Sequence, residues 1–300
     1  MQLTNGWTMT SGLTFTSSAT PPPAGGNLVM TFNTQTANTV YLPLGGDGGS
    51  VNAVIDWGDG NTALATTAHV YSHTYDTINT YQVTITGTMS GYGYSFSGSE
   101  NSPLISVDSW DNDLGITTLQ FAFEGATNLT QVPNTLPSTV QLINYMFSGA
   151  TSLYSLDLSG WNTSNVTGWD GVFSGATTFN GNISTWNTSQ ATSMTTFFYN
   201  CYYFNGNISS WNVANVNSMN NMFENAERFN QNIGNWDVAN VNAMNGMFSF
   251  AGAFNQNLSS WTTELTSQPD NFSTGANAVF ANNASNLKPY LSGGTVRINT

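Results

Sequence analysis

The chain has 300 residues, of which only 3 are Lys or Arg and 16 are Asp or Glu, so its formal net charge is −13. Proteins that bind nucleic acid neutralise phosphates with Lys and Arg, and anionic lipid surfaces attract the same side chains. We therefore expect no nucleic-acid partner and no adhesion to anionic lipid. The aromatic content of 13% indicates a folded chain, because disordered chains lack the apolar groups that offset the entropy of ordering.

Neither of the usual membrane signals is present in the sequence. The first residues, MQLTNGWTMTSGLTFTSS, lack the basic and apolar regions of a secretory signal, and no run of about 18 apolar residues predicts a membrane span. We expect no membrane insertion. The single Cys201 excludes an internal disulfide.

Residues 1–26 alternate weakly between apolar and polar side chains and end in TPPPAGG, and such Pro and Gly clusters punctuate secondary structure. The pattern predicts an N-terminal arm followed by a linker. An arm that docks on a neighbouring protein and a loosely held terminus are the two alternatives.

Residues 27–99 have the pattern of an all-β module. Runs such as NLVMTFNT and TYQVTITGTM are rich in β-branched and aromatic residues, and Gly, Asn and Asp separate them, which is typical of a β-sandwich. The segment VIDWGDGN, followed by His73-Thr74-Tyr75 and by TYQVTI, resembles the Ig-like module of the polycystic-kidney-disease (PKD) type. That resemblance implies an Ig-like sandwich that serves as a spacer or adhesion unit.

Residues 100–300 are dominated by a repeat of 25 residues. A fixed period of about 20 to 50 residues is the signature of a solenoid. The two most regular columns are tryptophans at Trp161, Trp186, Trp211, Trp236 and Trp261, and phenylalanines at Phe173, Phe198, Phe223 and Phe248. The atypical stretch 100–120 precedes the repeats, and its Ile105, Val107 and Trp110 are expected to form a first strand that caps the solenoid.

Each repeat predicts one short helix and one short strand. Met219, Met222, Phe223 and Ala226 follow the i, i+3, i+4, i+7 spacing of a helical face. Phe229, Ile233 and Trp236 follow in a segment where we expect a short strand, and stacked coils pair such strands in parallel. The predicted fold is mainly β with short helices: an Ig-like sandwich followed by a right-handed, leucine-rich-repeat-like solenoid with end caps.

The repeat units resemble the BspA-like leucine-rich repeats of bacterial and mycoplasmal surface proteins. The resemblance rests on the pattern WDVANVxxMxxMFxxAxxFNxxL, which runs from Trp236 to Leu258. It implies a non-enzymatic adhesion or recognition surface. In that family a PKD-like module often precedes the repeats.

The repeated polar and aromatic columns allow two interpretations. Buried, the tryptophans pack the core; exposed, they would stack on sugars. The asparagine column can form hydrogen-bonded ladders between coils or present amides to a glycan, and packing and ladders are the favoured interpretations. That column comprises Asn180, Asn205, Asn230 and Asn255, with Asn182, Asn207, Asn232 and Asn257 two residues later.

Few residues indicate a cofactor. Asp108, Asp111 and Asp113 in DSWDND are weak calcium candidates, because Ca²⁺ takes six to eight oxygen ligands and the string lacks the rest; a solvated turn is the favoured alternative. His69 and His73 lie in a predicted strand, where packing is favoured over metal binding. Cys201 takes the place of a small core Ala. We expect no cofactor.

The best candidates for binding are residues that break the repeat: Tyr202, Tyr203 and the isolated Arg228. We expect a non-catalytic display or recognition protein, first as a virion protein of a phage (head decoration or fibre) on the particle surface, and alternatively as a BspA-like bacterial cell-surface adhesin. The expected partners are other particle or surface proteins, reached through the N-terminal arm or the sandwich, and a host glycan or protein; a homo-oligomer is compatible with both settings. A glycan-active enzyme ranks last, since the few acids of the repeats do not recur in register.

Overall fold

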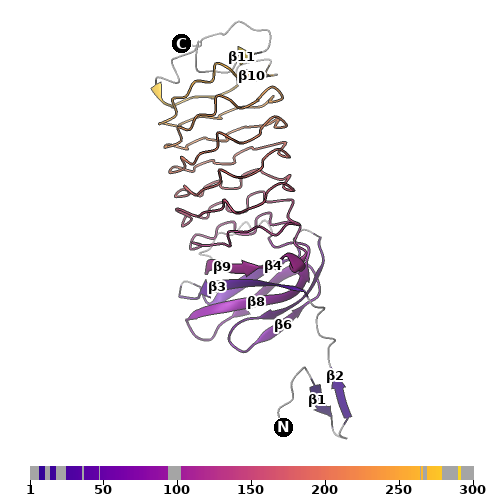
Figure 1. The fold of residues 1–300 in the computed structure, drawn as a ribbon. Helices are drawn as coiled ribbons and strands as arrows, with labels where there is room; N and C mark the ends of the chain where they lie inside the picture. Colours follow the sequence, from indigo (N-terminus) through magenta and orange to yellow (C-terminus); the bar gives the residue numbers. More distant parts are fainter. Residues whose placement is uncertain are drawn as a thin grey trace.

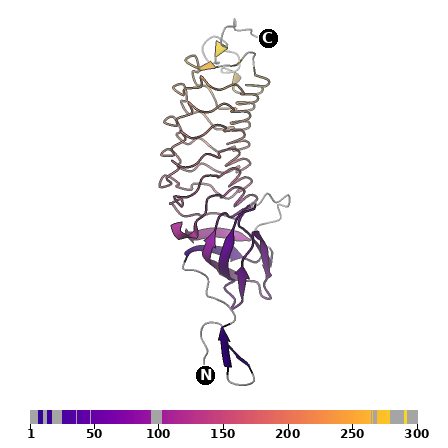
Figure 2. The ribbon, with the colours of Figure 1, turned by 90° about the vertical axis from the view of Figure 1, so that its right-hand side faces the viewer.

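The computed structural model describes residues 7–10, 14–17, 25–35, 37–46, 48–93, 103–263, 265, 269–278 and 290–291. The described chain is mainly β, as predicted. A small domain of β-strands is followed by a tall stack of similar coils (Figures 1 and 2). Within the predicted N-terminal arm, β1 (Trp7–Thr10) pairs antiparallel with β2 (Thr14–Ser17).

The strand domain has two layers. A five-stranded sheet in the order β6-β5-β8-β3-β9 forms one layer, and β4 pairs with β7 in the other. Side chains of β3 alternate between buried and half-buried along the whole strand, as expected when one face of a sheet covers a core. The strands are β3 (Gly26–Asn33), β4 (Thr39–Leu44), β5 (Val51–Asp56), β6 (Thr62–Ala65), β7 (His69–Thr74), β8 (Thr80–Met89) and β9 (Leu104–Trp110).

Strand β9 joins the two parts of the molecule. On one side it pairs antiparallel with β3, and on the other Ser106 forms a parallel bridge with Gln131 of the first coil. The amide of Val107 donates to the carbonyl of Gln131 at 2.9 Å. The capping strand expected around residue 105 is therefore also the edge strand of the sheet, so the sequence-based boundary at residue 100 comes just before a strand that both parts share.

After the 3₁₀ turn η1 (Asn112–Leu114), the chain forms successive coils, and backbone hydrogen bonds join each coil to the next. Three alternate amides show the pattern. Thr196, Phe198 and Asn200 donate at 2.9 Å to Asn220, Met222 and Glu224, the carbonyls one coil further on. Parallel bridges such as Ser193 to Ser218 mark the same stacking. Each coil contributes one buried phenylalanine to a common column: Phe123, Phe147, Phe173, Phe198, Phe223, Phe248 and Phe272.

The helix predicted over residues 219–226 is wrong: this segment is a series of tight turns. An α-helix sends every amide to the carbonyl four residues back. Here every second amide bonds three residues back, as Ala226 does to Phe223 at 3.0 Å, and those between reach the next coil. Asn221 and Asn225 also have positive φ of 54° and 59°, which no right-handed helix contains.

The strand expected in each coil is reduced to single bridges. The described coils contain parallel bridges between isolated residues, because the alternate amides that turn back within a coil leave no continuous ladder. Near the C-terminal end, where the sequence predicts an end cap, β10 (Thr262–Thr263) pairs in parallel with β11 (Tyr290–Leu291). The right-handedness of the solenoid stays a prediction.

Candidate recognition surface

The aromatic columns make up the core of the coil stack. The rings of Phe198 and Phe223 lie 5.6 Å apart and nearly parallel, and Phe223 and Phe248 repeat that arrangement. Within one coil, Phe229 stacks on Phe223 at 4.0 Å. All of these rings are fully buried, so the columns are unavailable to a ligand.

The tryptophan column is buried as well. Each indole Nε1 donates to a main-chain carbonyl of the preceding coil, as Trp186 does to Leu158 at 3.0 Å and Trp211 does to Ile183 at 3.2 Å. Trp161, Trp236 and Trp261 make the equivalent bonds. A buried indole N–H normally needs such a partner. The geometry is that of packing and not of a sugar-stacking platform.

The asparagine column forms a hydrogen-bonded ladder between coils, and the presentation of its amides to a glycan stays a prediction. The Oδ1 atoms of Asn180, Asn205 and Asn230 each accept from the main-chain amide of the next asparagine, at 2.8, 3.0 and 2.9 Å. Asn182, Asn207, Asn232 and Asn257 instead accept from the amide two residues on, within their own turns. The side-chain oxygens of Asn180, Asn205 and Asn230 therefore link neighbouring coils, and those of the second set close turns within a coil.

Tyr202, Tyr203 and Arg228 lie together on one edge of the stack; we call these three residues the exposed patch. The guanidinium carbon of Arg228 lies 4.2 Å from the centre of the Tyr203 ring, and the main-chain amide of Arg228 donates to the carbonyl of Tyr202 at 3.1 Å. The tyrosines are 36% and 40% exposed. These three sequence candidates thus form one continuous surface across two coils.

The fold does not require large residues at the patch. The position before the second phenylalanine of each coil is Thr178, Tyr203, Arg228 or Ala253. The Thr178 hydroxyl donates to the carbonyl of Thr151 in the preceding coil at 2.6 Å, whereas Tyr203 and Arg228 make the link to the preceding coil through their main-chain amides. A small residue therefore satisfies the stack there, and the patch is additional to it.

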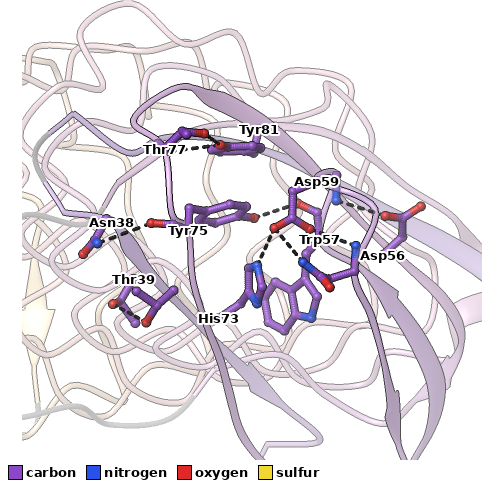
Figure 3. A network of polar contacts seen from close by, with 12 residues as sticks. Asn38, Thr39, Asp56, Trp57, Asp59, His73, Tyr75, Thr77 and Tyr81 are labelled. Atoms are coloured by element: carbon purple, nitrogen blue, oxygen red, sulfur yellow. Dashed lines mark hydrogen bonds and ion pairs between the residues drawn. The ribbon is translucent and has the colours of Figure 1, made fainter.

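The WGDG segment forms a polar corner of the sandwich (Figure 3). The Asp59 carboxylate accepts from His73 Nε2 at 2.7 Å and from the amide of Asn61 at 3.0 Å, while the Tyr75 hydroxyl donates to the Trp57 carbonyl at 2.7 Å. The His73 ring also stacks on Trp57. Burial alone would raise the pKa of Asp59, but the hydrogen bonds from His73 and Asn61 and the nearby His73 charge outweigh it and lower the pKa to about 2. The corner has the partners of a structural brace, with His73 in the packing position expected from the sequence.

Asp108, Asp111 and Asp113 do not converge. Asp108 accepts from the Thr31 hydroxyl at 2.6 Å, and Asp111 accepts from the amide of Asn27 at 2.9 Å, so both carboxylates brace β9 against β3. Asp113 lies exposed in η1. Within the described ranges, no three His, Cys, Asp or Glu side chains are close enough to hold a metal ion. The weak calcium candidates thus gain no support.

Three titratable groups in the coils, a cysteine and two glutamates, have a raised pKa. Cys201 is fully buried, which raises the pKa of its thiol, and its Sγ donates to the carbonyl of Phe173 at 2.8 Å. Burial raises the pKa of the Glu124 and Glu224 carboxyls, and a hydrogen bond with Ser148 partly offsets this at Glu124. The two glutamates occupy the same repeat position four coils apart, roughly 19 Å at the usual spacing of about 4.8 Å. They are too far apart to work as a pair.

Residues 89–204 and 181–286 match the protein family described as "Mycoplasma protein of unknown function, DUF285". The chain belongs to this family. DUF285 is the repeat domain of BspA-like surface proteins, which supports the resemblance of the coils to that group. The match starts at residue 89, so it leaves most of residues 27–99 uncovered, and their PKD-like resemblance stays a prediction. No curated protein and no solved structure matches the chain.

Two exposed aromatics of this DUF285 chain were missed in the sequence. Tyr154, 61% exposed, occupies the first position of the asparagine column, and Phe250, 51% exposed, has a positive φ of 56°. Tyr154 could have been found from the sequence, because aligning Leu153 with Phe179 gives Tyr154 the same repeat position as Asn180. Among the described residues, no helix is long and apolar enough to cross a bilayer.

Proposed function

We propose that this DUF285 protein is a non-catalytic recognition protein of a bacterial cell surface, in which the coil stack displays a lateral binding surface. The observation that carries the proposal is the exposed patch: its large residues are not needed by the coils, yet they lie together where two coils meet. The membership in a family of surface repeat proteins supports the same setting. The cell surface is therefore preferred over the virion surface expected first from the sequence.

The rod-like construction suits display. Because β9 is hydrogen-bonded both to β3 and to the first coil, the sandwich and the stack are linked by a shared strand and not by a free linker. We place the attachment to the cell at the N-terminal end, through the arm or the sandwich, and the binding surface on the coils.

The non-catalytic part of the proposal rests on where the acids lie. Glycoside hydrolysis uses two carboxyl groups about 5 to 10 Å apart. Glu124 and Glu224, the two coil carboxyls with raised pKa, are roughly 19 Å apart by coil spacing. Their positions favour binding over hydrolysis.

The test is the location of the native protein. Antibodies raised against residues 103–263 should label intact, unpermeabilised cells of the source bacterium, and mass spectrometry should find the chain in the envelope fraction. Recovery of the chain in purified phage particles, with unlabelled cells, would replace the cell surface with the virion. Labelling only after permeabilisation, with no recovery of the chain in phage particles, would contradict surface display in either setting.

A further inference from the structure

The exposed patch contains a guanidinium that lies over an aromatic ring and donates no hydrogen bond to the described residues. The guanidinium carbon of Arg228 lies over the Tyr203 ring, 4.2 Å from its centre. Stacking uses the face of the guanidinium and leaves the N–H groups at its edge available for a planar, bidentate acceptor. Among the described residues none accepts a hydrogen bond from this side chain, and the one ion pair, between His73 and Asp59, lies in the sandwich.

The charge of the molecule makes this guanidinium distinctive. Arg228 is the only Lys or Arg in the described part of a chain whose net charge is −13. An anion that binds the described part of the chain therefore has one permanent positive charge to pair with, the guanidinium of Arg228. A carboxylate matches the fork of N–H donors in both charge and geometry.

A row of amide donors runs beside the patch. Asn205 follows Tyr203 by two residues and Asn230 follows Arg228 by two, and both belong to the ladder that includes Asn180 and Asn255. The Oδ1 atoms of Asn180, Asn205 and Asn230 are occupied between coils, whereas the Nδ2 groups of the four side chains meet no acceptor among the described residues. The surface is therefore rich in free donors, which suits a ligand rich in acceptor oxygens.

We propose that the exposed patch binds a carboxylated sugar, of the uronic or sialic acid class, within a glycan. The sugar carboxylate accepts from the edge of Arg228, ring hydroxyl oxygens accept from Asn205 and Asn230, and the C–H face of the sugar packs on Tyr202 and Tyr203. Sugars combine a hydroxyl-rich edge with an apolar face, which matches amide donors beside exposed tyrosines better than an acidic peptide does. This inference rests on the proposed recognition function and names its ligand class.

The first experiment compares acid and neutral forms of one sugar on the intact chain. Biolayer interferometry would use immobilised oligogalacturonate beside its methyl ester, sialyllactose beside lactose, and poly-L-glutamate as an acidic peptide. The chain should bind at least one acidic sugar about tenfold or more tightly than its neutral partner, since a charge-assisted hydrogen bond contributes at least that factor. Equal binding to acid and neutral forms, no binding to either acidic sugar, or tighter binding to poly-L-glutamate would overturn the proposal.

The second experiment assigns the effect to Arg228. Arg228→Gln keeps hydrogen-bond donors but removes the charge, and should weaken acidic-sugar binding about tenfold or more; Arg228→Lys should retain part of it, because a point charge cannot form the bidentate contact. Tyr203→Thr, the residue that the preceding coil uses, should weaken binding to both forms. Tyr41→Ala, which changes an exposed tyrosine of the sandwich, is the matched control and should leave binding unchanged. Unaltered binding by Arg228→Gln, with the same thermal unfolding midpoint as the parent, would overturn the assignment.

These results separate from the location test. Cell-surface labelling without acidic-sugar binding would remove this inference and leave the proposed function standing. Arg228-dependent binding of acidic sugar by a chain that is recovered only from phage particles would keep this inference and remove the cell-surface setting of the proposed function.

Discussion

The indole Nε1 of Trp236 donates a hydrogen bond of 3.2 Å to the main-chain oxygen of Ile208, one coil earlier. The same oxygen accepts the main-chain amide of Trp211 at 3.1 Å. The Ile208 carbonyl thus accepts one hydrogen bond that closes a turn within its own coil and a second that links it to the following coil. Because the equivalent bond recurs at every member of the tryptophan column, this column stabilises the stack and is not exposed for ligands.

Replacing Trp236 by Phe should destabilise the chain by about 1 to 2 kcal/mol, because a buried hydrogen bond and some packing volume are lost while the Ile208 oxygen keeps one donor. Urea unfolding followed by circular dichroism would measure the change. Tyr154→Phe, at a largely exposed ring, is the control and should change stability by less than about 0.5 kcal/mol. A Trp236→Phe protein as stable as the control would contradict the fastening role.

The surface ladder predicts a contrast between two changes at one position. Asn205 Oδ1 accepts from the amide of Asn230 at 3.0 Å and from Gln231 Nε2 at 2.9 Å. Asn205→Ala removes this acceptor and should cost about 1 kcal/mol, because water replaces it only in part at a surface position. Asn205→Asp keeps the acceptor and should recover most of that loss in the same urea titration. If both variants unfold at the same urea concentration as the parent, the ladder does not hold the coils together.

The turns predict opposite effects of two changes in one column. Thr196 has a positive φ of 54°, a conformation that a β-branched residue rarely adopts. Thr196→Gly should raise stability by about 1 kcal/mol, since glycine adopts this conformation without the Cβ clash. Gly171→Ala should lower stability, because φ there is 61° and a Cβ would lie 2.1 Å from the Tyr145 ring. Thermal unfolding of both variants checks the signs, and a destabilised Thr196→Gly protein would contradict the turn geometry.

The polar corner of the sandwich predicts an acid-dependent loss of stability. The pKa of Asp59 is lowered from 3.8 to about 2, so between these values the unfolded chain binds more protons than the folded chain. The stabilisation from this carboxylate is therefore complete above about pH 4 and is lost as the pH falls toward 2. Thermal unfolding midpoints recorded from pH 6 to pH 2 should fall less steeply for Asp59→Asn than for the parent. Parallel pH profiles would show that Asp59 makes no such contribution.

The sequence predicts the columns well and the backbone between them poorly. Trp186, Phe198 and Asn205 belong to columns that recur every 25 residues, and a constant period requires stacked, equivalent environments. The helix expected from Met219 to Ala226 was wrong. The same spacing of apolar residues also occurs in this series of turns, in which every second amide bonds to the neighbouring coil. A partial signal for the turns was present, since Gly or Asn, which tolerate positive φ, stand at Asn221 and Asn225 and at several equivalent positions such as Gly171 and Gly175. Thr196 and Phe250 at other equivalent positions have the same positive φ without that signal.

The candidate surface was predictable only as a break in the repeat. Tyr203 and Arg228 stand out because Thr178 and Ala253 hold the same repeat position in the neighbouring coils. Tyr202 stands out because its equivalents are Thr177, Glu227 and Gly252. Their stacking across two coils depends on three-dimensional register, which the sequence alone does not supply. The shared strand β9 was missed for a similar reason: pairing with β3 links residues more than 70 positions apart.

The most direct measurement uses a variant in which the three patch residues are replaced by the residues that other coils have at the same repeat positions. A variant carrying Tyr202→Thr, Tyr203→Thr and Arg228→Ala copies Thr177, Thr178 and Ala253 of the other coils. On a glycan array, beside the parent chain, this variant should keep the parent's unfolding midpoint to within a few degrees and lose its glycan binding. An equally stable variant that binds the same glycans as the parent would contradict the account that recognition resides in the exposed patch.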